Sequence, residues 1–329
     1  MTTRTRSTGD GRASRAAAGQ PTAQAVTRPA QPPGSIPFPA VLASWAVAAV
    51  LTARPKQWPK NLLVFAAPLA GATLGRDDGF AYALVAFAAF TAASSAVYFI
   101  NDLADADRDR THPTKRLRPI ASGRLPVPVA LAIAAFLIAV AILAGFWIGE
   151  PRLAAVVGGY FVLSLGYSMG LKHVPYLELA FVAVGFVFRA IGGAVATHVP
   201  PSAWFLTVCS LGALMVAIGK RYIELSVLGP DAARHRPVMR WYRLPALRAA
   251  QRTVTLLMWV SYLAWALTAS DGWIQGWHLA SAGPLALALF RFDQLTGAAD
   301  GRPVEDLISR DPMMVCCELT WLALFTIGL

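Results

Sequence analysis

Long apolar stretches recur along this chain and limit its fold more than any other feature. Each runs for about 17 to 23 residues, and about 20 apolar residues in an α-helix cross the hydrocarbon core of a bilayer. The segments between them carry most of the charged residues. We therefore predict an all-α membrane protein with nine transmembrane helices, at 58–75, 80–101, 127–149, 152–170, 175–197, 202–221, 252–269, 274–291 and 313–329.

Two further segments precede these helices. The apolar piece 37–53 ends just before Arg54, and we interpret it as an interfacial helix that lies on the membrane surface. Residues 1–36 are rich in Thr, Ala, Arg, Gly, Gln and Pro and have no apolar periodicity. Such a composition cannot bury enough apolar surface to fold. The sequence thus predicts a disordered basic N-terminal tail over 1–36 and one transmembrane domain over 37–329.

The charge of the chain points to a membrane and not to a nucleic acid. Of the 329 residues, 56% are hydrophobic and only 14% are charged, and the formal net charge is +11. Basic residues concentrate in the connections 102–126 and 222–251, whereas the alternate connections hold only Arg76 and Arg152. Positively charged loops stay in the cytoplasm. We expect a multi-pass cell-membrane protein, surrounded by lipids, with its N-terminus inside and its C-terminus outside.

Acidic residues follow directly on the apolar segment 80–101. Asn101, Asp105 and Asp109 are spaced four apart, so on a continuing helix they would share one face. Stacked carboxylates repel unless a cation lies between them, and Mg²⁺ prefers such oxygen ligands together with substrate phosphates. Lys115 and Arg118 come next and could neutralise phosphate oxygens. An ordinary solvated loop is the alternative interpretation, but the position at a membrane boundary favours a site for Mg²⁺ and substrate phosphate.

These residues also resemble a known signature. Asn101-Asp102-x-x-Asp105-x-x-x-Asp109, followed by Arg118-Pro-Ile-Ala-Ser-Gly, is similar to the first aspartate-rich motif of the UbiA superfamily of intramembrane transferases. The resemblance runs from about residue 50 to the C-terminus. Its other pieces are Arg54-Pro-Lys56-Gln-Trp-Pro-Lys60-Asn61, His112-Pro-Thr-Lys115, Tyr167-Ser-Met-Gly-Leu-Lys172-His173, Phe188-Arg189-Ala-Ile-Gly-Gly and Gly219-Lys220-Arg221-Tyr222.

The resemblance implies a fold and a reaction. The fold is nine transmembrane helices around a central cavity capped by cytoplasmic loops. Within the superfamily the chain is most similar to members that move a 5-phosphoribosyl group from phosphoribosyl pyrophosphate onto a polyprenyl phosphate such as decaprenyl phosphate, with release of diphosphate. That reaction makes precursors of cell-wall arabinan. It requires Mg²⁺, which the resemblance assigns to Asn101, Asp105 and Asp109.

The resemblance also implies the remaining site residues. Asp102 joins the three metal ligands in the catalytic set. The residues expected to contact the substrates' phosphates and sugar are Lys56, Lys60, Tyr98, Lys115, Arg118, Lys172, Glu178, Arg189, Lys220 and Arg221. Glu178 stands where the resemblance implies an Asp, so its carboxylate reaches one methylene further.

Most members of the superfamily instead transfer a prenyl chain from its diphosphate to an aromatic acceptor, and that function remains the main alternative. Such enzymes carry a second carboxylate cluster. Here the segment 167–189 offers Lys172, His173 and Arg189 with a single acid, Glu178, which favours a substrate with additional phosphates. A terpene cyclase of the same fold and a non-enzymatic lipid-binding or transport protein are further alternatives. A homo-oligomer stays open.

Overall fold

A computed structural model describes residues 38–76, 78–268, 271–298 and 301–329. The N-terminal tail expected over 1–36 lies outside the described residues. The structure falls into two units, 1–41 and 42–329, and every contact discussed below lies within the second. The described residues form α-helices and short 3-10 helices joined by turns, as expected for an all-α protein.

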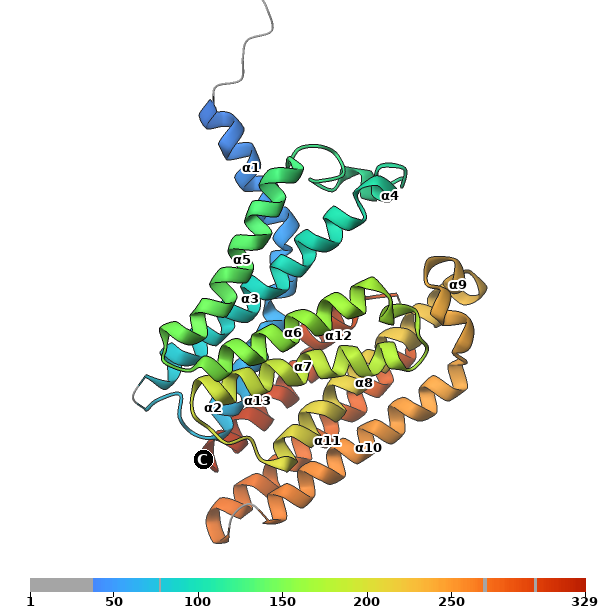
Figure 1. Cartoon of the computed structure of the whole chain (residues 1–329). Coiled ribbons are helices and arrows are strands. Elements are labelled where there is room, and N and C mark those ends of the chain that lie inside the picture. The colour runs from blue at the N-terminus through green and yellow to red at the C-terminus, as the bar shows by residue number, and fades with distance from the viewer. Residues whose placement is uncertain (1–37, 77, 269–270, 299–300) are drawn as a thin grey trace, which may run out of the picture. The chain divides into compact units, whose positions relative to one another are not determined.

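Figure 1 shows how the helices follow one another. In chain order they are α1 (Phe38–Ala53), η1 (Pro55–Phe65), α2 (Ala66–Ala70), α3 (Gly79–Ala104), α4 (Ala106–Arg110), η2 (Lys115–Leu117), α5 (Val127–Trp147), α6 (Pro151–Met169), η3 (Leu171–His173), α7 (Leu177–Ala196), α8 (Ala203–Leu228), η4 (Gly229–Asp231), α9 (Ala232–His235), η5 (Pro237–Trp241), α10 (Leu244–Thr268), α11 (Gly272–Ala298), α12 (Val304–Arg310) and α13 (Pro312–Ile327). Here η marks a 3-10 helix.

The helices support a multi-pass membrane protein. Among the described residues, five helical stretches are long and apolar enough to span a membrane: Gly79–Ala104, Val127–Trp147, Pro151–Met169, Leu177–Ala196 and Ala203–Arg234. Large apolar side chains on α5 face outward, with Phe136 66% and Leu143 61% exposed. Exposed apolar surface of this kind suits contact with lipid and not with water. Helices α10, α11 and α13 occupy the last three segments expected to span, but the count of nine spans stays a prediction.

The first expected span, 58–75, is not one α-helix, and this part of the prediction was wrong. The segment forms the 3-10 helix η1, the short helix α2 and a turn. Pro59 and Pro68 lack the backbone N–H that an α-helix interior requires, so each disfavours a continuous α-helix. The tighter 3-10 path directs Asn61 and Val64 inward, where both are buried.

A glycine pair lets η1 approach α7. A Cβ atom at Gly193 would lie 1.7 Å from the Val64 carbonyl oxygen, and one at Gly192 would lie 2.2 Å from the Phe90 ring. The sequence Gly192-Gly193 therefore serves close helix packing. Val64, Phe90, Leu153, Val157 and Tyr160 belong to the buried cluster that joins η1, α3 and α6.

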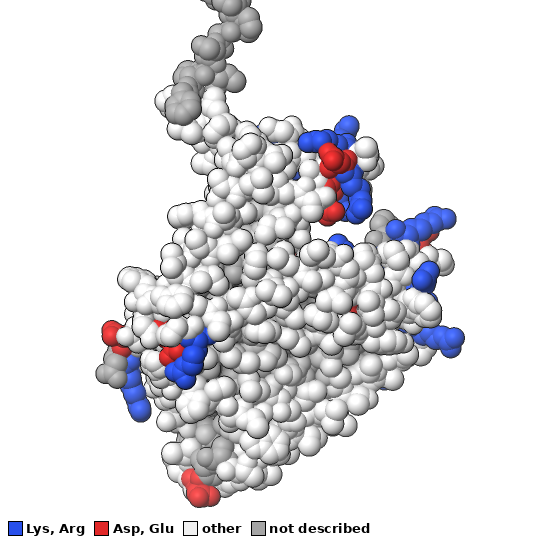
Figure 2. Space-filling model, viewed as in Figure 1, with Lys and Arg blue, Asp and Glu red and all other residues white. Residues whose placement is uncertain are grey.

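Charged side chains gather at the ends of the helices. Figure 2 shows them around α4, around α9 and at the opposite helix ends, whereas the face over α5, α6 and α7 is mostly uncharged. This is the distribution of a protein whose middle lies in lipid. Helices α4 and α9 lie in the connections 102–126 and 222–251, where the arginines are concentrated.

We expect Gly193→Ala to destabilise the protein by about 1–3 kcal/mol, because the added methyl group has no room beside a backbone carbonyl. Thermal unfolding in detergent, followed by circular dichroism, measures the change. Gly283→Ala is the matched control, since a Cβ atom there meets nothing within 4 Å. Equal melting temperatures for the two variants would contradict the close packing of η1 on α7.

Candidate active site

Arg118 connects the two buried carboxylates of the acidic segment. Its Nη1 donates to Asp109 Oδ2 at 2.7 Å and lies 3.3 Å from Asp102 Oδ1. Both aspartates are almost completely buried. Because unpaired buried carboxylates are costly, the guanidinium stabilises their charged forms and ties the loop after α4 to the end of α3.

Arg54 supplies a second cation to Asp102. Its Nη2 donates to Asp102 Oδ1 at 2.7 Å, and its guanidinium lies 4.6 Å from the centre of the Tyr98 ring. The residue precedes η1 with φ of 53°, a left-handed conformation that turns the chain into the 3-10 helix. Arg54 was not among the expected site residues, although it begins one of the motifs quoted above. Asp102 thus acts as a positioning residue for two arginines.

Asn101, Asp105 and Asp109 remain stacked even though α3 does not continue through them. The helix ends at Ala104 and α4 begins at Ala106, so the expected continuous helix is interrupted at Asp105. The amide of Asp105 still donates to the Asn101 carbonyl at 2.9 Å, and that of Asp109 to the Asp105 carbonyl at 2.8 Å. Their side chains nevertheless differ in surroundings. The Asn101 amide nitrogen donates to Ser168 Oγ at 3.0 Å, whereas Asp105 lies 3.5 Å from Arg108.

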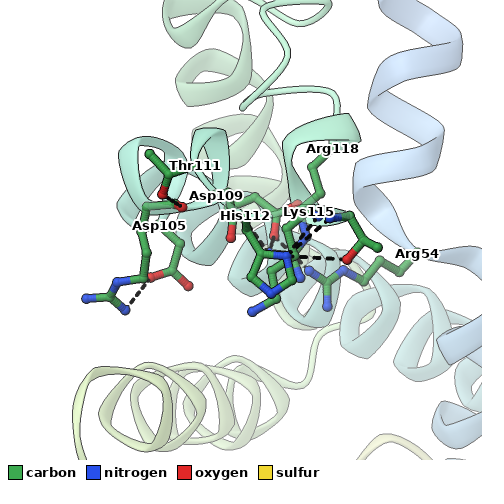
Figure 3. Close-up of polar contacts among 10 residues, drawn as sticks. Arg54, Asp105, Asp109, Thr111, His112, Lys115 and Arg118 are labelled. Atoms are coloured by element: carbon green, nitrogen blue, oxygen red, sulfur yellow. Dashed lines mark hydrogen bonds and ion pairs between the residues drawn. The ribbon is translucent and has the colours of Figure 1, made fainter. Parts of the chain in front are cut away.

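The loop after α4 presents cations beside these acids. Figure 3 shows Arg54, Lys115 and Arg118 in the region of the acidic segment, where Arg118 contacts Asp109 directly. His112 Nδ1 accepts hydrogen bonds from the backbone N–H groups of Thr114 and Lys115, both at 3.3 Å, and thereby shapes the turn that carries Lys115. The loop is anchored by Ile120 and Leu125, which are buried against α3 and α5. Lys115 itself is exposed and accessible to a ligand.

Arg189 lies deeper in the bundle, on α7. Its Nε donates to Asn61 Oδ1 at 2.7 Å, its Nη1 to the Gly185 carbonyl at 2.7 Å and its Nη2 to the Tyr160 hydroxyl at 2.9 Å. The guanidinium also lies 4.7 Å from the centre of the Tyr160 ring. Neutral partners satisfy these donors without cancelling the charge, so Arg189 keeps a buried positive charge. Asn61 and Tyr160, which hold the Arg189 guanidinium, were not among the expected site residues.

Glu178 was expected to contact substrate, and it lies in a buried network of arginines and a tyrosine. Its side chain is completely buried and accepts hydrogen bonds from Arg221 at 2.7 Å, Arg236 at 3.0 Å and the Tyr242 hydroxyl at 3.3 Å. The Tyr242 oxygen in turn accepts from the Tyr176 amide at 3.0 Å. The carboxylate therefore holds the loop after α8 onto the start of α7. Arg221 belongs to this network and also pairs with Glu224 at 2.5 Å.

The remaining expected residues divide into accessible and paired cations. Lys56 is exposed and Lys172, in η3, is partly exposed. Lys60 and Lys220 come from η1 and α8, and both pair with Glu305 of α12, a residue the sequence reasoning did not single out.

The oxygen donors of the acidic segment suit Mg²⁺. No three His, Cys, Asp or Glu side chains within the described part of the chain converge on one possible metal position. Mg²⁺ usually binds through one or two carboxylates and keeps its other positions for substrate phosphates and water. Asp105, which is partly exposed, and the Asn101 amide oxygen, whose NH₂ end is held by Ser168, are compatible with that coordination.

Fold and site together define a class of protein: an all-helical membrane protein with a polar site, rich in cations, where loops meet the ends of apolar helices. The chain belongs to the UbiA prenyltransferase family, whose profile matches residues 61–306.

Curated relatives match over nearly the whole chain. The decaprenyl-phosphate phosphoribosyltransferase of Mycobacterium tuberculosis is 38% identical over 297 residues, which are 88% of this chain and 95% of the relative. The protein of the same name from Corynebacterium glutamicum is 37% identical over 276 residues, 82% of each chain.

Solved structures share the fold. A UbiA homologue from Archaeoglobus fulgidus, bound to GPP and Mg²⁺, aligns with a TM-score of 0.64 at 14% identity, over 85% of this chain and 98% of that one. At such low identity the likeness shows, for this chain, the UbiA-like fold alone. The bound Mg²⁺ is a property of that homologue.

We expect Asp105→Asn to lower Mg²⁺-dependent turnover by about a hundredfold or more, because the amide removes a negative charge from the proposed metal position. The variant should also bind Mg²⁺ with diphosphate more weakly, which thermal-shift titration measures without turnover. Asp107→Asn is the control, since Asp107 is exposed and contacts only Arg110 among the ion pairs of the described residues. Unchanged turnover at the same Mg²⁺ requirement would remove Asp105 from the site.

Proposed function

We propose that this protein transfers the 5-phosphoribosyl group of phosphoribosyl pyrophosphate to a polyprenyl phosphate, decaprenyl phosphate being the expected acceptor, and releases diphosphate. The names of the relatives, which match most of the chain, support this reaction. The pairing of Glu178 with arginines also supports this reaction. The only acid of the segment 167–189 is buried in pairs with Arg221 and Arg236, so that segment offers a ligand mainly cations.

The acidic segment and the arginines that pair with it would bind the diphosphate leaving group. Asn101 and Asp105, with the Arg118-paired Asp109 in support, would hold Mg²⁺, which would supply Lewis-acid stabilisation of the diphosphate leaving group. Asp102 positions Arg54 and Arg118, whose charges favour the diphosphate as it leaves.

The sugar and the acceptor are assigned to the surrounding cations and Tyr98. Lys56, Lys115 and Lys172 are accessible for phosphate oxygens, and Tyr98 lies beside Arg54. The lipid phosphate is an anion near neutral pH and needs no strong base. Its oxygen forms the new bond to ribose C1 as the bond from C1 to the diphosphate oxygen breaks on the opposite face.

Prenyl transfer to an aromatic acceptor is the second candidate, because the family is described as prenyltransferases and a solved homologue binds GPP. Both reactions break a carbon–diphosphate bond, so the acidic segment serves either. The segment 167–189 distinguishes the two reactions, because it offers cations where prenyltransferases carry a second carboxylate cluster.

One assay decides between the two. Purified protein in detergent is supplied with Mg²⁺ and either labelled phosphoribosyl pyrophosphate with decaprenyl phosphate, or labelled geranyl diphosphate with 4-hydroxybenzoate. We expect a labelled lipid only from the first pair, and none when decaprenyl phosphate is omitted. Product from the second pair alone would overturn the assignment while leaving the fold intact.

We expect Lys172→Ala to weaken use of phosphoribosyl pyrophosphate about tenfold to a few hundredfold, since a charge-assisted contact to phosphate contributes roughly 1.5–3 kcal/mol. Lys172→Arg should recover part of the loss, because it keeps the charge. Steady-state kcat/KM for the donor measures both. Arg76→Ala removes an exposed cation from an alternate connection and should leave kcat/KM unchanged. An equal effect of Lys172→Ala and Arg76→Ala would exclude Lys172 from the site.

The site is assigned to the cytoplasmic side of the membrane. In a variant with Cys209, Cys316 and Cys317 replaced by serine, Thr114→Cys should react with a membrane-impermeant maleimide only from the cytoplasm. Asp271→Cys should react only from outside. Labelling of inside-out and right-side-out vesicles measures this. Reaction of both positions from one side would contradict the orientation.

A further inference from the structure

Two lysines far apart in the sequence share a single carboxylate. Lys220 Nζ donates to Glu305 Oε1 at 2.6 Å, and Lys60 Nζ lies 3.3 Å from the same oxygen. Lys60 Nζ also donates to Gln57 Oε1. The three charged residues come from η1, α8 and α12, so three separate elements meet at this point.

The cluster has an excess of positive charge. Asn61, next to Lys60 in the sequence, accepts a hydrogen bond from the buried Arg189, and the charge of Arg189 also acts on Lys60. Burial by itself would raise the pKa of Glu305, but the hydrogen bond and charge of Lys220, with the charge of Lys60, hold that pKa at about 2. Glu305 is therefore ionised at neutral pH, and one negative charge faces several positive ones.

The cluster is also accessible. The Lys60 and Lys220 side chains are each slightly under 30% exposed, and that of Glu305 is 47% exposed. Helix α12 is anchored from its other side, where Val304 and Leu307 are buried in the cluster with Phe292. The backbone of α12 is thus fixed by apolar packing, while the Glu305 side chain lies at a solvent-accessible position.

A phosphate group can replace this carboxylate. A phosphate monoester carries close to two negative charges at neutral pH and has three acceptor oxygens. It can therefore accept from both lysines with more charge than one Glu supplies. The Glu305 carboxylate is half-exposed, so a phosphate group can reach the two lysines and take its place.

Lys60 and Lys220 are already expected to contact substrate phosphate. We propose that Glu305 is an internal counterion that occupies the position of this phosphate between the two lysines until the substrate displaces it. The inference rests on the proposed function for the identity of the ligand. The phosphate belongs either to the lipid acceptor or to the 5-position of the ribosyl donor. Since Glu305 competes with the ligand, it lowers the apparent affinity by the fraction of molecules in which the site is closed.

Glu305→Gln tests the competition directly. The amide keeps the shape but loses the charge that neutralises the lysines, so affinity for the phosphate ligand should rise about two- to fivefold. Lys220→Met should weaken the same ligand about tenfold, and in the double variant the gain from Glu305→Gln should disappear. Asp306→Asn is the control, because the neighbouring Asp306 pairs with Arg310 and faces no lysine of this cluster.

Binding is measured by isothermal titration on the full chain in detergent, separately with phosphoribosyl pyrophosphate, decaprenyl phosphate and inorganic phosphate. The ligand whose affinity changes identifies the source of the phosphate. A weaker or unchanged affinity for all three ligands in Glu305→Gln would overturn the proposal, and a lower melting temperature would then show a structural role for Glu305. The proposed function fails separately, if the wild-type protein binds these ligands but forms no labelled lipid.

Discussion

Charge neutralisation at the boundary of the apolar bundle is the interaction on which the candidate site depends. Arg118 contacts both Asp102 and Asp109, and Arg54 contacts Asp102 from another segment. Breaking a buried ion pair by removing one partner costs about 3–5 kcal/mol, because the other charge stays buried. The group therefore joins the chain before η1, the end of α3 and the loop after α4 into one structure.

A second network of buried charges, centred on Glu178, also joins separate segments of the chain. Glu178 connects α7, α8 and the segment that follows α8 through Arg221, Arg236 and Tyr242. Charges paired in this way neutralise one another and are not available to a ligand. The cations that remain accessible, such as Lys115 and Lys172, are then left on loops whose positions these networks determine.

Much of the fold could be predicted because helix formation in lipid is a local property. The apolar segments expected at 80–101 and 127–149 form α3 at 79–104 and α5 at 127–147. The error over 58–75 has a local cause as well, since Pro59 and Pro68 could have been weighed against apolar length. Residues that act through a distant partner could not be found this way. Arg54 is 48 positions from Asp102, and Arg189 is 128 from Asn61.

The sequence by itself determined that the chain is a helical membrane protein with an acidic segment and cationic loops. These features are local. The length of an apolar segment, the charges beside it and the spacing of Asn101, Asp105 and Asp109 can each be determined from neighbouring residues. Only the tertiary structure decided which charges neutralise one another. It buried Glu178 among arginines and placed Glu305 between two lysines. The reason is physical: a helix forms from contacts four residues apart, whereas the partner of a charge depends on which helices pack together.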